Sequence, residues 1–308
     1  MLLDSLAALP AADEQVRAKR RLARAYGLCI LGLGAGTTAA GETAYGALEE
    51  AVNILRDEGS QPFILAAALY LQAAIAVEIG RTQGEESARE ALEIGRAHEY
   101  RDIQNLALNA LARWAMIRGD IETAAAYLAE ARQIRIGLAA PIIIMAQAYV
   151  ESMVSRFTGD LDGALRVLEE GVEKLHLTRH RHLANVLDSE VAHTLRQSGD
   201  LNGASEVYRR TILDWQDAGR RGAVANQLEC FAFIATAENQ LARATRLFGA
   251  AEALRETLDD KMMPEEKKEY DVHVAALREA QDAAVLQEAW QKGREMDLDT
   301  AIAYAISL

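Results

Sequence analysis

Two groups of residues in this 308-residue chain have types and spacings that could serve chemistry. The first is the stretch Gly32-Leu-Gly34-Ala-Gly36-Thr-Thr-Ala39, which matches the G-x-G-x-x-A pattern of dinucleotide-binding loops. That pattern requires a buried strand before it, but the preceding residues 17–24 are rich in arginine and lysine. The P-loop lysine is also missing. We therefore expect a helix end and an inter-helix loop here, and no cofactor.

The second group is a histidine cluster, His176, His180 and His182, within the run HLTRHRH. Imidazole is a common zinc ligand, but lysine and arginine flank these histidines and would repel a cation, and no cysteine or acid is interleaved. A solvated basic turn without a metal is the better interpretation. His98 and His273 are isolated in the sequence, and we expect them at the surface.

Signatures of catalysis are missing from the sequence, which contains no G-x-S-x-G, H-E-x-x-H or C-x-x-C. The carboxylates are spread along helical faces, where solvation explains them. The cysteines, Cys29 and Cys230, lie far apart in apolar stretches and are expected to be buried thiols. The residues thus favour a protein that is not an enzyme.

Charge and hydropathy exclude further classes. A net charge of −13 argues against direct binding of nucleic acid, which needs a basic face. The N-terminus has no basic n-region and carries Asp4, so it does not resemble a signal peptide. The longest apolar stretch, Phe63 to Val77, has 15 residues, too few to span a bilayer core of roughly 30 Å. We expect a cytoplasmic protein that does not bind a membrane.

A phrase recurs every 40 residues from residue 119 onwards. It is a Gly-Asp pair with a small residue seven places before the glycine, an alanine five places after it and a bulky residue four places further. The glycines are Gly119, Gly159 and Gly199, with Asn239 in the fourth position. The other members are Ala112, Ser152, Ala192 and Ala232, then Ala124, Ala164, Ala204 and Ala244, then Leu128, Leu168, Tyr208 and Phe248. Such periodicity is typical of repeat architectures.

The repeat predicts an all-α fold, a right-handed superhelical solenoid of antiparallel helix hairpins with a C-terminal helical cap. Glycine permits the left-handed backbone that ends one helix, and aspartate caps the start of the next. The expected parts are an N-terminal helix and glycine-rich loop (1–40), the repeats (41–257) and the capping helices (258–308). The expected helices are 13–32, 43–57, 63–79, 85–97, 101–118, 121–135, 141–158, 161–175, 182–198, 201–217, 222–238, 241–257, one opened by Pro264, 284–293 and 298–306.

The repeated phrase resembles the tetratricopeptide repeat (TPR), in which a small residue, Gly-Asp or Gly-Asn, an alanine and an aromatic residue fall at these offsets. The period here is longer than the TPR value of about 34, and the Trp, Tyr and Pro positions of the consensus are mostly lost. Longer repeats of this kind resemble the sensor regions of MalT-like and LuxR-type signal-transducing ATPases. The closing segment is similar to the end of those regulators, through LFGAAEALRE (247–256), a P-x-E with a tyrosine, and a W-x-x-G-R run ending in Ala301-Ile302.

The sequence lacks two elements of those regulators, the ATPase motif G-x-x-x-x-G-K-[ST] and a basic C-terminal helix-turn-helix. The resemblance therefore implies a sensor and scaffold part, either a fragment or a stand-alone relative, without ATP hydrolysis or DNA binding. It also places ligand-facing positions on the concave face, ten, six and three residues before each glycine. The candidate groove residues at these positions are Asn109, Arg113, Tyr149, Arg156, Ser189, His193, Arg196 and Glu229, and Asn226 joins them one turn before Glu229 on the same face.

Arginine side chains in such a groove suit a carboxylate or a phosphate, which they bind through two parallel hydrogen bonds. The function that follows is a non-catalytic sensor or interaction module of a bacterial regulatory protein. It would bind a protein or peptide segment, or a small anionic inducer. Two alternatives remain open: a groove that is merely solvated or whose arginines pair with carboxylates of adjacent helices, and a scaffold for self-association as a homo-oligomer.

Overall fold

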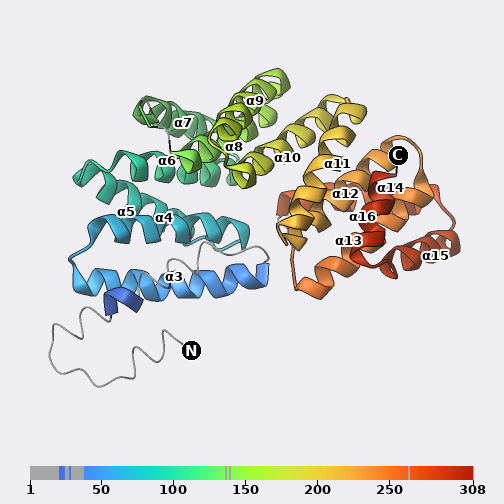
Figure 1. Cartoon of the computed structure of the whole chain (residues 1–308), viewed down its shortest axis with the longest axis horizontal. Coiled ribbons are helices and arrows are strands. Elements are labelled where there is room, and N and C mark those ends of the chain that lie inside the picture. The colour runs from blue at the N-terminus through green and yellow to red at the C-terminus, as the bar shows by residue number, and fades with distance from the viewer. Residues whose placement is uncertain are drawn as a thin grey trace. The chain divides into compact units, whose positions relative to one another are not determined.

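The computed structural model describes residues 21–24, 28, 38–135, 137–138, 140–262 and 264–307, and within these ranges all regular structure is α-helix. The chain divides into two compact units, Met1–Val150 and Glu151–Leu308. The helices are α3 (Thr38–Glu58), α4 (Pro62–Glu78), α5 (Gly84–Ala97), α6 (Arg101–Ile117), α7 (Ile121–Arg135), α8 (Pro141–Phe157), α9 (Leu161–Leu177), α10 (Arg181–Ser198), α11 (Leu201–Asp217), α12 (Arg221–Ala237), α13 (Leu241–Leu258), α14 (Pro264–Ala280), α15 (Ala283–Arg294) and α16 (Leu298–Ile306) (Figure 1).

The all-α fold of consecutive helix hairpins is confirmed, and the expected helices from residue 63 onwards agree with the structure to within two residues at each end. Helix α3 begins earlier than expected, at Thr38, and Gly41 lies inside it. A Cβ on Gly41 would lie 2.7 Å from a methyl group of Ile79, so this glycine allows α3 to pack closely on the end of α4. The expected helix 13–32, Cys29 and residues 32–37 of the glycine-rich stretch lie wholly or mainly outside the described residues.

The turns between helices repeat one geometry. At Gly199, φ is +91°, the N–H donates to the Arg196 carbonyl (3.2 Å), and the next N–H donates to the Leu195 carbonyl (3.0 Å). This pair of bonds is the Schellman ending of a helix. The residues with positive φ in the same position are Glu99, Gly119, Gly159, Arg179, Gly199, Gly219, Asn239 and Asp259. The turn therefore recurs every 20 residues, whereas the Gly-Asp pair recurs every 40.

The aspartates of the Gly-Asp pairs cap the following helices, as expected. Asp160 accepts a hydrogen bond from the Gly163 N–H (2.9 Å), and Asp200 accepts one from the Gly203 N–H (2.8 Å). A Cβ on Gly163 would lie only 2.0 Å from the Asp160 carboxylate, so the glycine at this position makes room for the cap. Both ends of the turn are thus specified by neighbouring residues.

The small and bulky residues of the repeated phrase lie in the core. All twelve, from Ala112 to Phe248, have 2% exposure or less. The fully buried alanines let the two helices of a hairpin approach closely, as the repeat predicts. In the first unit the core is formed mainly by α3 to α6, and α4 is buried along much of its length. Its polar Gln72 accepts a hydrogen bond from the Ser87 hydroxyl (2.8 Å).

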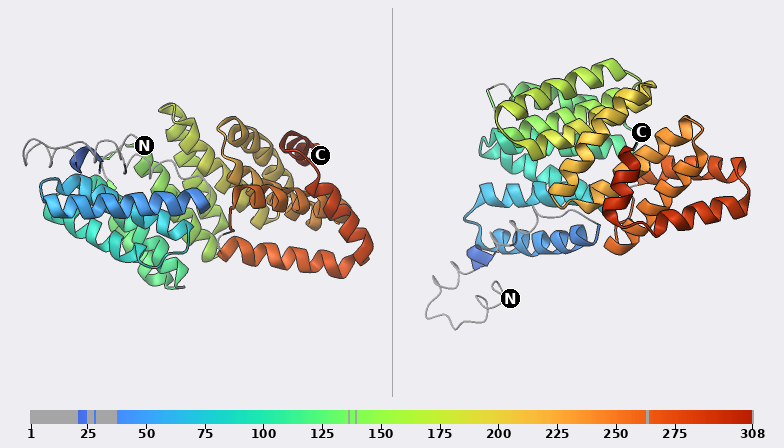
Figure 2. Two further views of the ribbon diagram at one scale, coloured as in Figure 1. Left: turned by 90° about the horizontal axis from the view of Figure 1, so that it is seen from below. Right: turned by 45° about the vertical axis from the view of Figure 1, so that its right-hand side comes forward.

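In the second unit, α13 and α15 cross at two glycines. A Cβ on Gly249 would lie 2.2 Å from the Trp290 carbonyl oxygen, and a Cβ on Gly293 would lie 2.0 Å from the Arg246 carbonyl oxygen. Only glycine permits this backbone approach. Figure 2 shows these closing helices, coloured orange to red, from two further directions.

Hydrogen bonds and ion pairs also join α13 to α15 at this crossing. The Trp290 indole N–H donates to Glu252 (2.7 Å), and Arg294 donates to both Glu252 (2.5 Å) and Glu256 (2.6 Å). The Trp290 ring stacks on Phe248, with 6.2 Å between ring centres. The phrases LFGAAEALRE and W-x-x-G-R, which are far apart in the sequence, therefore form one helix–helix contact.

Candidate partner-binding face

The candidate groove residues are divided between the two units. Asn109, Arg113 and Tyr149 belong to the first, on α6 and α8. The six others belong to the second, on α8, α10 and α12: Arg156, Ser189, His193, Arg196, Asn226 and Glu229.

In the first unit, Arg113 is held between two partners. Its Nη1 lies 2.6 Å from a Glu78 carboxylate oxygen, and its guanidinium carbon lies 5.4 Å from the centre of the Tyr149 ring. Asn109 is only 2% exposed, and its amide donates to the Asn105 carbonyl (2.8 Å). Arg113 and Tyr149 are thus brought together, whereas Asn109 is part of the core.

Arginines on successive hairpins bind glutamates 34 residues further along the chain. The pairs are Arg56–Glu90, Arg96–Glu130 and Arg156–Glu190. Each joins corresponding helices of neighbouring hairpins, because the repeat is regular. In the last pair, Nη2 and Oε2 lie 2.5 Å apart, and the side chains are 14% and 12% exposed. Arg156 is therefore paired with a carboxylate of an adjacent helix, which is one of the two alternatives that the sequence left open.

Arg196 departs from this rule, because Cys230 stands 34 residues after it. Arg196 instead donates through both terminal nitrogens to Glu269 of α14, at 2.7 and 3.0 Å. Burial by itself would raise the pKa of Glu269, but this double contact with Arg196 holds that pKa below its ordinary value. An arginine of the repeats is therefore paired with a carboxylate from a helix outside them.

Helix α14 makes two further contacts with α12. Glu266 accepts a hydrogen bond from the Asn226 amide (3.0 Å), and the His273 ring lies 4.5 Å from the Phe233 ring, centre to centre. The guanidinium of Arg196 lies over the same Phe233 ring, at 4.8 Å. His273, which was expected at the surface, is half-buried, because one side of its ring packs against Phe233. His98 is exposed, as expected.

The apolar side chains of α14 that become buried have helical spacing. Tyr270, Val274 and Leu277 are 9%, 5% and 0% exposed, and the Tyr270 ring meets Phe248 edge-on at 5.2 Å. By contrast, Val272 on the same helix is 66% exposed. This i, i+4, i+7 set of anchors is the arrangement by which an amphipathic helix binds a groove.

Glu229 forms a buried ion pair. Its carboxylate accepts two hydrogen bonds from Arg255 of α13, at 2.7 and 2.9 Å, and its side chain is 3% exposed. Burial raises the pKa of Glu229 above its ordinary value, although Arg255 opposes this rise. Glu229 therefore ties α12 to α13 and is not on an accessible surface.

His193 lies in a cluster with residues of the two following helices. Its Nδ1 is 2.7 Å from the Tyr208 hydroxyl and 3.6 Å from the Cys230 sulfur. Burial lowers the pKa of His193 to about 4 and raises the pKa of Cys230 to about 12. At neutral pH the imidazole is therefore uncharged and can accept a hydrogen bond from the Tyr208 hydroxyl, and the Cys230 thiol keeps its proton. The thiol of Cys230 is therefore not the thiolate that nucleophilic chemistry needs. The expectation that Cys230 is a buried thiol is confirmed.

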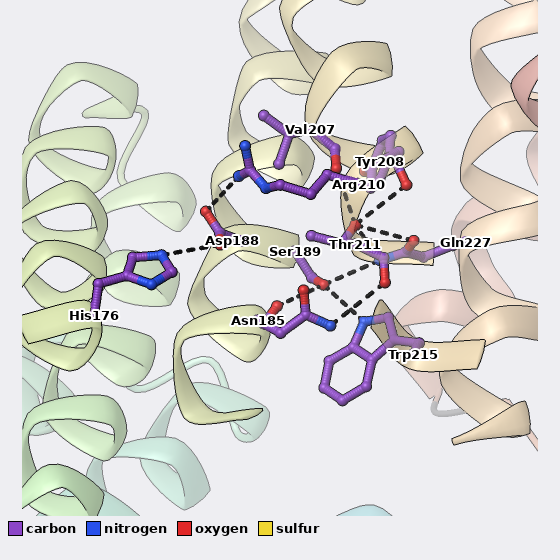
Figure 3. A network of polar contacts seen from close by, with 10 residues as sticks. All are labelled: His176, Asn185, Asp188, Ser189, Val207, Tyr208, Arg210, Thr211, Trp215 and Gln227. Atoms are coloured by element: carbon purple, nitrogen blue, oxygen red, sulfur yellow. Dashed lines mark hydrogen bonds and ion pairs between the residues drawn. The ribbon is translucent and has the colours of Figure 1, made fainter. Parts of the chain in front are cut away.

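Ser189 belongs to a polar network between α10, α11 and α12 (Figure 3). Its hydroxyl donates to the Asn185 carbonyl (2.9 Å) and accepts from the Trp215 indole (3.1 Å) and the Gln227 amide (3.0 Å). Gln227 also donates to the Thr211 hydroxyl (2.8 Å). These internal bonds occupy Ser189 in holding helices together.

The first unit contains a related polar contact. Asn105 donates to the Ala131 carbonyl (2.8 Å) and to Gln147 (3.0 Å). Asn185 and Gln227 stand 80 residues after Asn105 and Gln147, and Asn185 likewise donates to a carbonyl 26 residues further on. This spacing was a sequence signal for buried polar contacts between hairpins.

The histidines of the sequence cluster contact different residues in the structure. His176 lies 3.9 Å from Asp188, which Arg210 binds at 2.9 Å (Figure 3), and the His182 ring meets Trp215 edge-on at 5.3 Å. Within the part of the chain that the structure describes, no group of three or more His, Cys, Asp or Glu side chains could hold a metal ion.

Comparison with known proteins yields a likeness of fold. The structure is similar to a crystal structure of nearly identical TPR-like repeats from a Podosopora anserina protein described as a kinesin light chain, with 16% sequence identity and a TM-score of 0.45. The match covers 66% of this chain and 98% of the other. The sequence matches no protein-family model and no curated protein. The described residues form an all-α array of consecutive helix hairpins. No helix among the described residues has the length and apolar character needed to cross a membrane.

Sequence reasoning missed Glu266 and Glu269, the α14 residues that meet α10 and α12. One signal was available. Arg156 pairs with a glutamate 34 residues later, but the residue 34 positions after Arg196 is Cys230. The carboxylate that pairs with Arg196 therefore comes from another part of the chain. Its location on α14 could not be read from the spacing.

Proposed function

We propose that this chain is a non-catalytic interaction and sensor module of a bacterial regulatory protein. Its binding surface would be the α10–α12 face, defined by Arg196, Asn226 and Phe233. The observation that supports this most strongly is the pairing of Arg196 with Glu269, a carboxylate from outside the repeats.

The chemistry of this face favours an acidic protein segment. Arg196 offers a planar fork that matches a carboxylate, Asn226 offers an amide donor, and Phe233 offers an aromatic ring beneath the guanidinium of Arg196. A helical segment with glutamates three residues apart would reach both polar groups, as Glu266 and Glu269 do. A small anionic inducer could use the arginine alone.

The assignment to regulators of the MalT-like and LuxR type rests on the closing segment. Its characteristic residues, Gly249, Trp290, Gly293 and Arg294, lie together at the crossing of α13 and α15. That the two distant phrases form one structural contact supports a common origin for them as a unit.

The test is a thermal-shift screen of the full chain against acidic helical peptides, their glutamine counterparts and anionic metabolites, with molar mass measured alongside. A ligand of this face should raise the melting temperature of the wild-type protein. The same ligand should bind the Arg196→Lys variant about tenfold more weakly than wild type, because lysine cannot donate two parallel hydrogen bonds to a carboxylate. The matched control is Arg181→Lys, which changes a 79% exposed arginine. If no acidic ligand stabilises the protein and its mass rises with concentration, the self-association scaffold is the better account.

A further inference from the structure

We propose that α14 is an internal ligand of the α10–α12 face, and that an acidic amphipathic helix of a partner protein binds there by displacing it. This inference rests on the proposed function and names the class of partner for that site. Figures 1 and 2 show α14 as a helix of the second unit that follows the last repeat hairpin.

The first argument is that Arg196 lacks the glutamate with which Arg156 pairs inside the repeats. Arg156 finds its glutamate within the repeats, on the next hairpin, whereas Arg196 meets Cys230 at that position. A largely buried arginine requires a carboxylate, and the repeats do not supply one at the corresponding place. Glu269 supplies it from 73 residues further along the chain. The face is thus complementary to a carboxylate that another chain could bring.

The second argument is the division of contacts along α14. Its side towards α10 and α12 carries the polar contacts of Glu266 and Glu269 and the His273 ring on Phe233. Its buried apolar anchors are three side chains, whereas α12 buries twelve residues. The side chain of Glu269 is also 38% exposed, so water can reach the ion pair and weaken it. An element held in this way opens at lower free energy than the hairpins beneath it.

The third argument is the pattern that α14 itself displays. Carboxylates at Glu266 and Glu269 precede buried Tyr270, Val274 and Leu277. A partner helix with two acids three residues apart, followed by apolar residues at i, i+4 and i+7, would reproduce every one of these contacts.

The experiment uses charge reversal in the full chain. Glu269→Lys places a cation opposite Arg196, and we expect amide hydrogen exchange over 264–280 to accelerate about tenfold or more, with α10 to α13 unchanged. The matched control is Asp271→Lys, which makes the same charge change at a side chain that is 58% exposed and pairs with Lys267 of its own helix. Glu269→Gln, which removes the charge without reversing it, should give a smaller acceleration in the same segment.

A second readout is binding of a fluorescein-labelled synthetic peptide with the sequence of residues 264–280, followed by anisotropy. We expect the peptide to bind the Glu269→Lys chain at least about tenfold more tightly than wild type, because α14 no longer competes. A peptide with both glutamates replaced by glutamine should lose this binding.

The outcomes separate the two proposals. If Glu269→Lys accelerates exchange throughout α10 to α16, or leaves α14 protected, then α14 is an integral part of the unit and the inference is wrong. Equal binding of the peptide to wild type and Glu269→Lys would also overturn it, because the face would already be open. If α14 is released but no acidic peptide binds, then α14 can leave the face, but the acidic partner helix is refuted and the proposed function fails with it.

Discussion

Replacing Gly293 by alanine tests whether the crossing of α13 and α15 holds the closing helices of the second unit together. The added Cβ would lie 2.0 Å from the Arg246 carbonyl oxygen and 2.9 Å from the Arg246 Cα. These are backbone atoms and cannot turn aside as the end of a side chain would. Ordinary contact begins at 3.4 Å, so the two helices must move apart by about 1 Å or more.

Two opposing terms determine the size of the effect. Overpacking of this kind costs about 1–3 kcal/mol, and separation of the helices also weakens the hydrogen bonds of Trp290 and Arg294 to Glu252. Alanine in place of glycine within a helix stabilises the folded state by about 1 kcal/mol through its higher helix propensity. We expect Gly293→Ala to lower the free energy of unfolding of the second unit by about 2 kcal/mol.

Gly46 provides the matched control, because it is also within a helix. A Cβ there would meet nothing within 4 Å, and the residue is exposed on α3. Gly46→Ala should therefore raise the free energy of unfolding by about 0.5–1 kcal/mol through helix propensity alone. The same chemical change is thus expected to have opposite signs at two positions.

The assay is urea unfolding of each variant, followed by far-ultraviolet circular dichroism and by tryptophan fluorescence. Fluorescence includes a signal from Trp290 at the crossing, and Trp114→Phe/Trp215→Phe in the background of each variant would make that signal specific. If Gly293→Ala proves as stable as wild type while Gly46→Ala gains stability, the helices do not approach as closely as described and the reasoning is refuted. A loss in both variants would instead refute the propensity argument.

Three other predictions concern single residues. Arg179 has φ of +59°, so Arg179→Gly should raise the free energy of unfolding by about 1 kcal/mol in urea titrations, and Gly199→Ala, whose Cβ would meet nothing, should lower it by a similar amount. Asp200→Ala removes a helix cap and should cost about 1 kcal/mol, unless water replaces the bond to the Gly203 N–H without loss. The pKa of His193 is about 4 in the folded protein and 6.5 when unfolded, so the unfolded chain binds more protons between these values. Stability should therefore be retained above pH 6.5 and fall by up to about 3 kcal/mol as the pH drops to 4. His193→Gln should flatten this part of the profile, and an unchanged slope would contradict the assignment.

The helix boundaries could be predicted from the sequence because they depend on neighbouring residues. Glycine at positions 119, 159 and 199 permits positive φ, and the aspartate that follows caps the next helix within three residues. Local chemistry of this kind is visible in a short window of sequence. The breaks at Glu99 and Arg179 were also expected from the helix pattern, but their left-handed backbone was not, because neither residue type favours positive φ.

The candidate site could be predicted only in part. Arg196 was identified from its place in the repeat, but its partner Glu269 lies on a helix outside the repeat, where periodicity gives no guidance. Asn109 and Glu229 share the predicted register with Arg196, yet packing against Asn105 and Arg255 buries them. The position of a residue in the repeat predicts on which side of its helix the side chain lies. Whether that side chain is exposed depends on which other helices pack against that side.

The amino-acid sequence by itself determined the all-α class, the 40-residue hairpin and the buried small residues between helices, because each depends on backbone preference and on side-chain size at a fixed spacing. Only the tertiary structure decided that α14 lies against α12 and supplies Glu269 to Arg196, and that Gly249 and Gly293 face each other's helices. Each of those contacts joins a residue of the repeats to one beyond them, 40 or more positions away. Their energies depend on the docking of whole helices, which no local pattern encodes.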